Sequence, residues 1–195
     1  MKLLKRSYNW VISFSGRPGA VWALAFVSFI ESSIFPIPPD VLLIPMVLAA
    51  RSRWLAIAMI CTIASVLGGL AGYAIGYFLY DVIGRTLLEF YGYSAQFMSF
   101  QQRYNDLGAW IVFVAGTTPF PYKVVTIASG VTRLDLTTFT IASTLARGLR
   151  FFIIAALLFW LGPPIRHFIE KRLGLMLGVF VILLISGFVI LKYLV

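Results

Sequence analysis

The chain has 195 residues, of which 61% are hydrophobic and only 12% are charged. An ordinary soluble domain is nearer half apolar and a quarter charged, and a chain this short cannot bury the excess in a water-soluble core. The composition excludes a soluble enzyme, a disordered tail and a disulfide scaffold, and it indicates an integral membrane protein. One cysteine and one histidine exclude an internal disulfide, a thiolate metal cluster and a multi-histidine site. The net charge of +9 is attributed to anchoring on anionic cytoplasmic lipid rather than to nucleic acid.

Residues 1–15 have polar and apolar faces at helical spacing. Lys2 and Arg6 share one face, whereas Leu4 and Tyr8 share another. The pattern predicts an interfacial helix on the membrane surface. A signal peptide is not expected, because the segment is too polar and lacks an Ala-x-Ala cleavage pattern.

Residues 18–50 are apolar but contain two acidic side chains, Glu31 and Asp40. A charge near the bilayer centre costs roughly 2.5–3.5 kcal/mol, so such residues normally face protein or a wet cavity. Prolines interrupt the same region, and a continuous helix cannot accommodate them. We therefore predict a re-entrant hairpin, in which two short helices enter and leave the membrane on one side. The gating residues of this hairpin are the prolines of its break, Pro36, Pro38 and Pro39.

Residues 54–80 are an uncharged run of 27 residues and predict a transmembrane helix, since a span needs about 20 apolar residues. Gly68, Gly72 and Gly76 are spaced by four and line one face, which predicts close packing against another helix. Residues 82–107 mix aromatic and polar side chains and predict an interfacial helix or linker between the two halves of the chain.

Residues 108–132 repeat the pattern of the first hairpin. Pro119 and Pro121 break the apolar segment, and Lys123 lies at its tip. The two Pro-x-Pro breaks are 83 residues apart, and each precedes an apolar arm, a short basic loop and a long helix. We expect two inverted hairpin-plus-helix repeats, a transporter layout with the site near the midplane; five plain spans are the alternative. In both arrangements the excess of Lys and Arg places the N-terminus in the cytoplasm.

Residues 136–161 and 173–194 predict two further transmembrane helices. Within the first, a polar stripe lines one face at steps of three, four and three: Thr140, Ser143, Arg147 and Arg150. Two explanations stay open for its arginines. Either they pair with the two buried acids and lock the bundle, or they hold an anionic headgroup, because guanidinium forks match phosphate oxygens.

Glu31 and Asp40 also have two open roles. A carboxyl group held between a low-dielectric cavity and a nearby cation can load and release a proton, which would couple transport to a proton gradient. A permanent salt bridge is the alternative. Lys123 is a third cation for the substrate, unless its long stem extends to the interface. The sequence has no Ser–His–acid set, metal-ligand cluster or phosphate-cradling glycine loop, so we expect neither an enzyme nor a cofactor.

In their order and spacing these motifs resemble the DedA family, also called VTT-domain or SNARE-associated Golgi-type membrane proteins. The resemblance covers about residues 1–165, and the short length resembles the YqaA-like branch. The matching parts are the Glu31…Pro-Pro-Asp40 hairpin, the glycine-rich Gly68–Gly76 helix, the second hairpin ending at Gly130, and the run Ala146-Arg147-Gly-Leu-Arg150-Phe151.

The second hairpin departs from the family's pattern. Many members carry Arg-x-x-Pro-x-x-Arg there, but Gly116 and Tyr122 stand at the two arginine positions of this chain. Lys123 lies one position later and is the candidate substitute. The departure weakens any transfer of substrate contacts to this hairpin.

The resemblance implies lipid movement, because bacterial members are linked to undecaprenyl phosphate recycling and phospholipid flipping, often with dependence on the proton-motive force, and eukaryotic relatives are phospholipid scramblases. We expect an all-α, multi-pass protein of the plasma (inner) membrane that moves a phosphate-headed lipid. Its expected partners are anionic membrane lipids and not nucleic acid, and a homo-oligomer is compatible with the sequence. A proton-coupled transporter of a small solute or cation, or a non-transporting assembly factor, is the alternative. The expected substrate-binding residues are Arg147, Arg150 and Lys123, and the expected proton carriers are Glu31 and Asp40.

Overall fold

The computed structural model describes residues 19–35, 38–118 and 120–162, and this part of the chain contains helices and no strand. The all-α prediction is confirmed for these residues. The helices predicted over 1–15 and 173–194 lie outside the described residues, as do Pro36 and Pro119.

The first proline-rich region forms two short helices, α2 (Gly19–Ser33) and α3 (Asp40–Ala49). Pro39 is the N-cap of α3 and Asp40 lies in its first turn. The fixed φ of proline and a negative charge both suit the start of a helix. The short 3-10 turn η1 (Arg51–Arg53) then connects α3 to the next helix.

The longest helix extends further than the sequence predicted. α4 (Trp54–Leu79) continues through a π-helical turn, η2 (Tyr80–Gly84), into α5 (Arg85–Tyr91). With η1 these elements form one 41-residue helical segment, Arg51–Tyr91. The helix therefore does not stop at Tyr80, and the first part of the expected linker is its continuation. Gly92 ends it with φ of 70°, a left-handed conformation that glycine adopts without a Cβ penalty.

The second half of the chain returns from that end. α6 (Ser94–Asp106) is followed by α7 (Gly108–Thr117) and α8 (Tyr122–Val131), with the second proline break between α7 and α8. Asp135 then caps the helix Leu136–Gly162, because its carboxylate accepts hydrogen bonds from the backbone N–H and the hydroxyl of Thr138, both at 2.8 Å.

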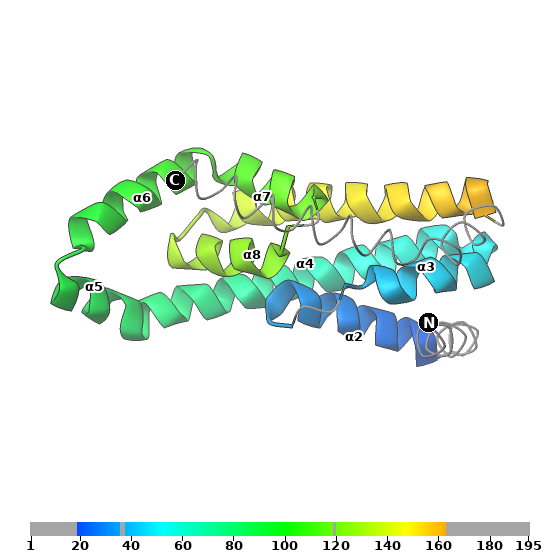
Figure 1. The fold of residues 1–195 in the computed structure, drawn as a ribbon, viewed down its shortest axis with the longest axis horizontal. Helices are drawn as coiled ribbons and strands as arrows, with labels where there is room; N and C mark the ends of the chain where they lie inside the picture. Colours follow the sequence, from blue (N-terminus) through cyan, green and yellow to red (C-terminus); the bar gives the residue numbers. More distant parts are fainter. Residues whose placement is uncertain (1–18, 36–37, 119, 163–195) are drawn as a thin grey trace, which may run out of the picture.

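The two long helices run antiparallel along the molecule, with the short helices beside them (Figure 1). α2 and α3 lie beside the first half of α4, and α8 lies beside its second half. Glycines permit this close approach. A Cβ on Gly68 would overlap the carbonyl oxygen of Phe29 in α2, and a Cβ on Gly76 would overlap that of Ile127 in α8.

The interior consists of two apolar clusters with a polar layer between them. The first cluster includes Ile57 and Cys61 of α4, and the second is packed against Leu70 and Tyr73 of the same helix. Ser65 lies between these positions and is fully buried. The antiparallel helix Leu136–Gly162 meets the clusters in the opposite order along the chain, with Phe139 and Ala142 in the second cluster, Phe151 and Ala155 in the first, and buried Arg147 between them.

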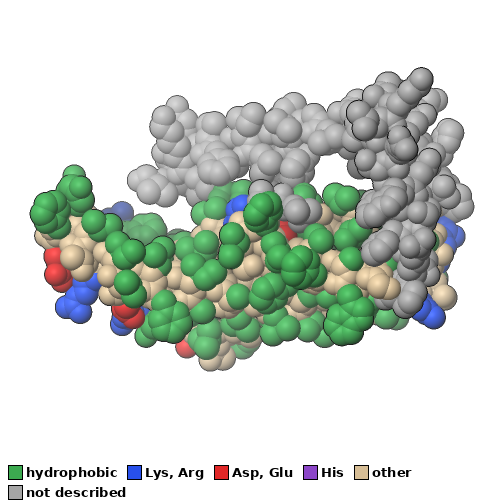
Figure 2. Space-filling model, turned by 90° about the horizontal axis from the view of Figure 1, so that it is seen from below, with side chains coloured by type: hydrophobic (Ala, Val, Ile, Leu, Met, Phe, Trp, Pro, Cys, Tyr) green, Lys and Arg blue, Asp and Glu red, His purple; other side chains and the backbone are tan. Residues whose placement is uncertain are grey.

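The outer surface is apolar. Leu55, Met59, Ile63 and Leu67 form an exposed stripe on α4, while the inner face carries serine, threonine and glycine. Hydrophobic side chains cover most of the face shown in Figure 2, and charged ones gather mainly toward its two ends. Small residues inside and large apolar residues outside are typical of helices packed in a membrane. Two helices, Arg51–Tyr91 and Leu136–Gly162, are long and apolar enough to cross one by length and composition.

Candidate functional site: two ion pairs between the helix breaks

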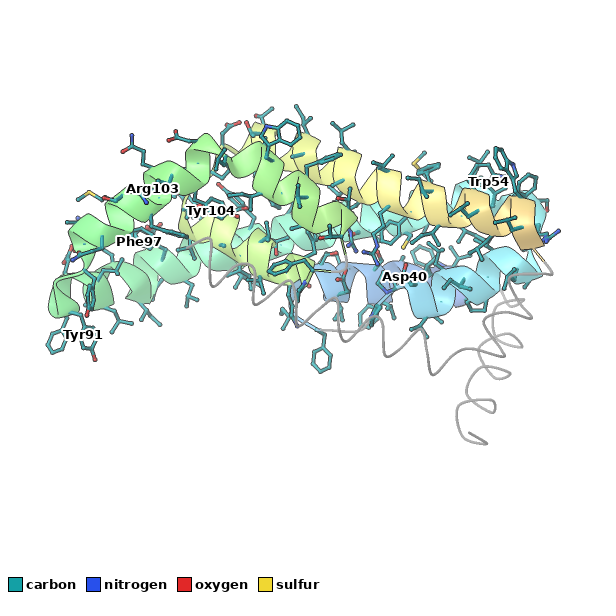
Figure 3. All side chains as sticks on the ribbon, turned by 45° about the horizontal axis from the view of Figure 1, so that its top comes forward. Asp40, Trp54, Tyr91, Phe97, Arg103 and Tyr104 are labelled. Carbon is teal, nitrogen blue, oxygen red and sulfur yellow. The ribbon has the colours of Figure 1, made fainter. Side chains whose placement is uncertain are left out.

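The charged residues of the interior meet midway along the bundle. Figure 3 shows Asp40 between Trp54 at one end of the molecule and Tyr91 at the other. Helix Leu136–Gly162 supplies two arginines at this level, and the first proline-broken region supplies two carboxylates. The second broken region reaches the same level through the carbonyl oxygen of Thr118, which accepts a hydrogen bond from Arg150.

Arg147 is almost completely enclosed, with 3% of its side chain exposed. Its Nη2 lies 2.7 Å from Oε2 of Glu31, and its Nε donates to Oγ of Ser65 at 2.6 Å. The guanidinium carbon lies 4.9 Å from the ring centre of Tyr122 and 4.7 Å from that of Phe151. The arginine is thus held by an ion pair, a hydrogen bond and two aromatic rings.

Two serines extend this network. Ser32 donates to Oε2 of Glu31 at 3.1 Å, and the hydroxyls of Ser32 and Ser65 lie 2.7 Å apart. Both serines are fully buried. A buried charge is tolerated when its remaining hydrogen-bonding groups have partners. Ser32 and Ser65 provide such hydrogen bonds to the Glu31–Arg147 pair.

Arg150 is held less completely than Arg147. Its Nη2 lies 2.7 Å from Oδ2 of Asp40, and its Nη1 donates to the carbonyl oxygen of Thr118 at 2.8 Å. The Nε of Arg150 and the Oδ1 of Asp40 are both buried, and neither has a hydrogen-bond partner among the residues that the structure describes. The two side chains are 18% and 20% exposed, respectively.

Hydrogen bonds also join the two breaks to each other. Lys123, at the start of α8, donates from Nζ to the carbonyl oxygen of Ile34 at 3.2 Å. Thr126, one turn later, donates to the carbonyl oxygen of Ser32 at 3.1 Å. Lys123 is therefore directed at the backbone of the first break, and its described hydrogen bond lies outside the two ion pairs.

The departures from the family motif have a structural reason. A Cβ on Gly116 would lie 2.7 Å from Cβ of Ala146 and 3.7 Å from Cδ of Arg147, so the position has no room for an arginine. Tyr122, at the other motif position, is fully buried and stacks on Arg147. Its hydroxyl donates to Oγ of Ser143 at 2.5 Å. Gly116 thus leaves room for the helix that carries Arg147, and Tyr122 covers the guanidinium of Arg147.

The loop before Leu136–Gly162 carries a separate charged contact. Arg133 has φ of 53° and pairs with Asp81 in the π-helical turn. Its guanidinium carbon lies 4.9 Å from the ring centre of Tyr77. The hydrogen bond to Asp81 raises the pKa of Arg133, which stays charged, so this contact ties the loop to the end of α4.

The structure brings together four of the residues singled out from the sequence: both arginines and both acids form the pairs foreseen as one of the two explanations. Substrate binding and proton transfer by these groups stay predictions. Of the gating prolines, Pro38 and Pro39 border the first break and Pro121 borders the second. The sequence reasoning missed Ser32 and Ser65 as partners of the ion pair, although each is a polar residue within an apolar helix.

Comparison with known proteins identifies the family of the chain. The profile of the VTT domain matches residues 37–160. The chain belongs to the VTT-domain (DedA) family of membrane proteins. It is 36% identical to an uncharacterized protein of Haemophilus influenzae and 32% identical to one of Histophilus somni, over 98% of this chain and 100% of each relative. No solved structure matches.

The match places most of the site inside the VTT domain. Asp40, Lys123, Arg147 and Arg150 lie within the matched residues. Glu31 lies just before residue 37, where the match begins, yet it forms the ion pair with Arg147. The charged centre of this VTT-domain protein therefore includes α2, which precedes the matched region.

Proposed function

We propose that this VTT-domain protein moves a phosphate-headed lipid, such as a polyprenyl phosphate or a phospholipid, across the membrane as a flippase or scramblase. The observation that carries the proposal is the pair of arginines at the level where both helix breaks meet. Guanidinium groups bind phosphate oxygens with two parallel hydrogen bonds. Irregular backbone at membrane depth is tolerated where it lines protein or a wet cavity, as a headgroup path requires.

The proposed cycle uses the two breaks as gates. Each helix–break–helix unit with the long helix that follows it forms one repeat, and the two repeats are inverted and re-entrant in this proposal. The phosphate headgroup displaces a carboxylate from an arginine and binds the guanidinium in its place, while the acyl chains stay in the surrounding lipid. Glu31 and Asp40 take up protons when they lose their cation, which would couple movement to a proton gradient.

The protein is a multi-pass component of the plasma (inner) membrane with a cytoplasmic N-terminus, and it performs no covalent chemistry. Its partners are anionic lipids rather than nucleic acid. Lys123 assists the headgroup when its hydrogen bond to Ile34 opens.

Lipid movement in proteoliposomes tests the proposal. Fluorescent phospholipids and a polyprenyl phosphate are followed with and without an imposed pH gradient, for the wild type and for Arg147→Ala and Arg150→Ala. We expect movement by the wild type and loss in both variants, with monodisperse elution as the check on folding. An unchanged lipid distribution for every probe with well-folded wild type would reject the proposal.

A second function has one specific observation in its favour. Within residues 19–35, 38–118 and 120–162, Oδ1 of Asp40 has no hydrogen-bond partner, so a proton can be added there without breaking a described hydrogen bond. Proton-coupled transport of a small solute or cation would use such a site equally well. Solute-dependent proton flux without lipid movement would select this function.

A further inference from the structure

The two ion pairs of the central layer differ in how completely their hydrogen-bonding groups are used. Arg147 donates from Nε and Nη2 and lies between two aromatic rings, and Oε2 of Glu31 accepts from both Arg147 and Ser32. Ser65 joins the same cluster through Ser32. A group that breaks this pair must replace several contacts at once.

The Arg150–Asp40 pair is open by comparison. Arg150 donates from Nη1 and Nη2, but within the described part of the chain its buried Nε–H and the buried Oδ1 of Asp40 have no hydrogen-bond partner, whereas no buried atom of Glu31 or Arg147 is left without one. Among the described residues no aromatic ring lies over the guanidinium of Arg150, whereas two lie over that of Arg147. An unsatisfied donor and an unsatisfied acceptor in a buried position favour a ligand that offers the complementary groups.

We propose that the two pairs have separate roles: Glu31–Arg147 is a permanent strut of the bundle, and Arg150–Asp40 is the pair that opens to bind phosphate. The inference rests on the proposed function, and it assigns the headgroup to one arginine instead of two. A phosphate oxygen accepts from Nε–H of Arg150 together with a second guanidinium N–H, and Asp40 is displaced or receives a proton.

The placement of Arg150 gives its opening a mechanical effect. Asp40 is the first residue of α3 and Thr118 is the C-cap of α7, so Arg150 links one helix end from each broken region. A ligand that takes over guanidinium N–H groups releases one or both of these ends. The strut at Arg147 meanwhile keeps α2, α4 and Leu136–Gly162 together, because Glu31, Ser65 and Arg147 lie on these three helices.

Matched variants of the two pairs test the assignment in the detergent-solubilised full chain. Glu31→Gln and Asp40→Asn each remove one carboxylate charge, and Arg150→Gln removes the proposed ligand group. The probes are a short-chain phosphatidate and the corresponding diacylglycerol, which lacks the phosphate. Thermal unfolding is recorded with and without each probe.

We expect Glu31→Gln to lower the melting temperature clearly more than Asp40→Asn. The phosphatidate should raise the melting temperature of the wild type, whereas diacylglycerol should not. Arg150→Gln should weaken the apparent affinity at least about tenfold, because the loss of even one of the two charge-assisted hydrogen bonds has an effect of that size. Equal destabilisation by the two carboxylate variants, or an unchanged phosphatidate effect in Arg150→Gln, would overturn the division of roles.

A measurement on the wild type tests the assignment even if the variants fail to fold. Phenylglyoxal modifies accessible arginines, and peptide mass spectrometry reads each position. We expect modification at Arg150 that phosphatidate or inorganic phosphate slows, and little at Arg147; equal rates at the two positions would contradict the inference. Lipid movement is measured separately: phosphate protection at Arg150 without any lipid movement rejects the proposed function alone, and lipid movement that Arg150→Gln leaves unchanged rejects the inference alone.

Discussion

Glu31 and Arg147 are joined across more than a hundred residues of sequence, yet their environment is built mostly by neighbours without charge. Ser32 and Ser65 satisfy polar atoms of the pair, and Tyr122 and Phe151 cover the guanidinium. Replacing the carboxylate removes the counter-charge but leaves the arginine enclosed. The consequence for stability is therefore set by the arginine that remains.

Glu31→Gln is expected to lower the free energy of unfolding by about 3 kcal/mol or more, because it leaves a buried guanidinium without its counter-ion. Denaturant unfolding in detergent micelles measures the loss. Glu89→Gln is the matched control, since the Arg85–Glu89 pair is exposed and its loss should cost less than about 0.5 kcal/mol. Equal losses in the two variants would contradict the role given to burial.

Asp135 gives a prediction on pH. Hydrogen bonds from the backbone and hydroxyl of Thr138 lower the pKa of Asp135. A carboxylate whose folded pKa is lowered contributes stability above its unfolded pKa of about 3.9 and loses the contribution as the pH falls through the folded value. The difference in melting temperature between wild type and Asp135→Ala should therefore shrink from about pH 5 to about pH 3.

Asp135→Asn separates the cap from the charge. Asparagine is also a good N-cap, but it does not titrate. The melting temperature of Asp135→Asn should stay above that of Asp135→Ala at low pH, whereas the corresponding difference for the wild type decreases. A wild-type advantage that stays constant across the range would show that the carboxylate charge is not involved.

At the level of single residues, the position of charges within apolar segments identified the charged centre. Glu31, Asp40, Arg147 and Arg150 stand out because charge is rare in apolar segments. The sequence did not reveal which acid meets which arginine, since this depends on the heights at which the helices cross. It also did not reveal the stacking of Tyr122 on Arg147, because an aromatic residue in an apolar segment fits equally well on the lipid side.

Between elements, glycine sets how closely helices approach. Gly76 of α4 and Gly130 of α8 face each other's helices: a Cβ on Gly76 would overlap the carbonyl oxygen of Ile127, and one on Gly130 that of Tyr73. Backbone atoms cannot turn aside as a side chain does. The contact between α4 and α8 is therefore intolerant of even one added methyl group.

Gly76→Ala is expected to destabilise the protein by about 1–3 kcal/mol, because α8 must move away from α4 to accept the new methyl group. Gly148→Ala is the control within a helix, since its Cβ would make an ordinary contact of 3.7 Å with Thr62. It should be neutral or stabilising, because alanine has the higher helix propensity. Denaturant unfolding compares the two, and similar losses would argue against close packing as the cause.

The helices themselves were predictable to different degrees. The proline breaks and the capped start of Leu136–Gly162 follow from local chemistry, since proline and N-cap residues act within one turn. The end of α4 was not predictable in this way. Asp81 is charged and ends the uncharged run of the sequence, but it pairs with Arg133 from a distant loop, and the helix continues through the π-helical turn.

As a whole, the molecule has two apolar clusters separated by the charged layer, and the two broken regions meet across that layer. Lys123 and Thr126 donate hydrogen bonds to the backbone of the first broken region, and Arg150 bonds to Asp40 of the first region and to Thr118 of the second. Large apolar surfaces resist rearrangement, whereas these few polar contacts can exchange partners. We therefore expect movement of the breaks to be concentrated at the charged layer.

Joining the two breaks covalently should stop transport. Ile34→Cys and Lys123→Cys, in a Cys61→Ser background, are linked with a short reducible bifunctional thiol reagent. Lipid movement in proteoliposomes should cease on cross-linking and return after the cross-link is reduced. The reason is that the contact made by the hydrogen bond between residues 123 and 34 in the wild type must open in the proposed cycle. Each single-cysteine variant with the reagent is the control, and undiminished movement in fully cross-linked protein would contradict a gating role.

The length of the Arg51–Tyr91 helix has a further consequence. Its 41 residues extend about 60 Å, twice the roughly 30 Å thickness of the hydrocarbon layer. The buried positions of α4 end at Gly76, so α5 and the turn at Gly92 project beyond the bundle. This projection offers a natural place for an epitope or a protease site, and the compartment in which it is recognised will give the sidedness of the entire protein in the living cell.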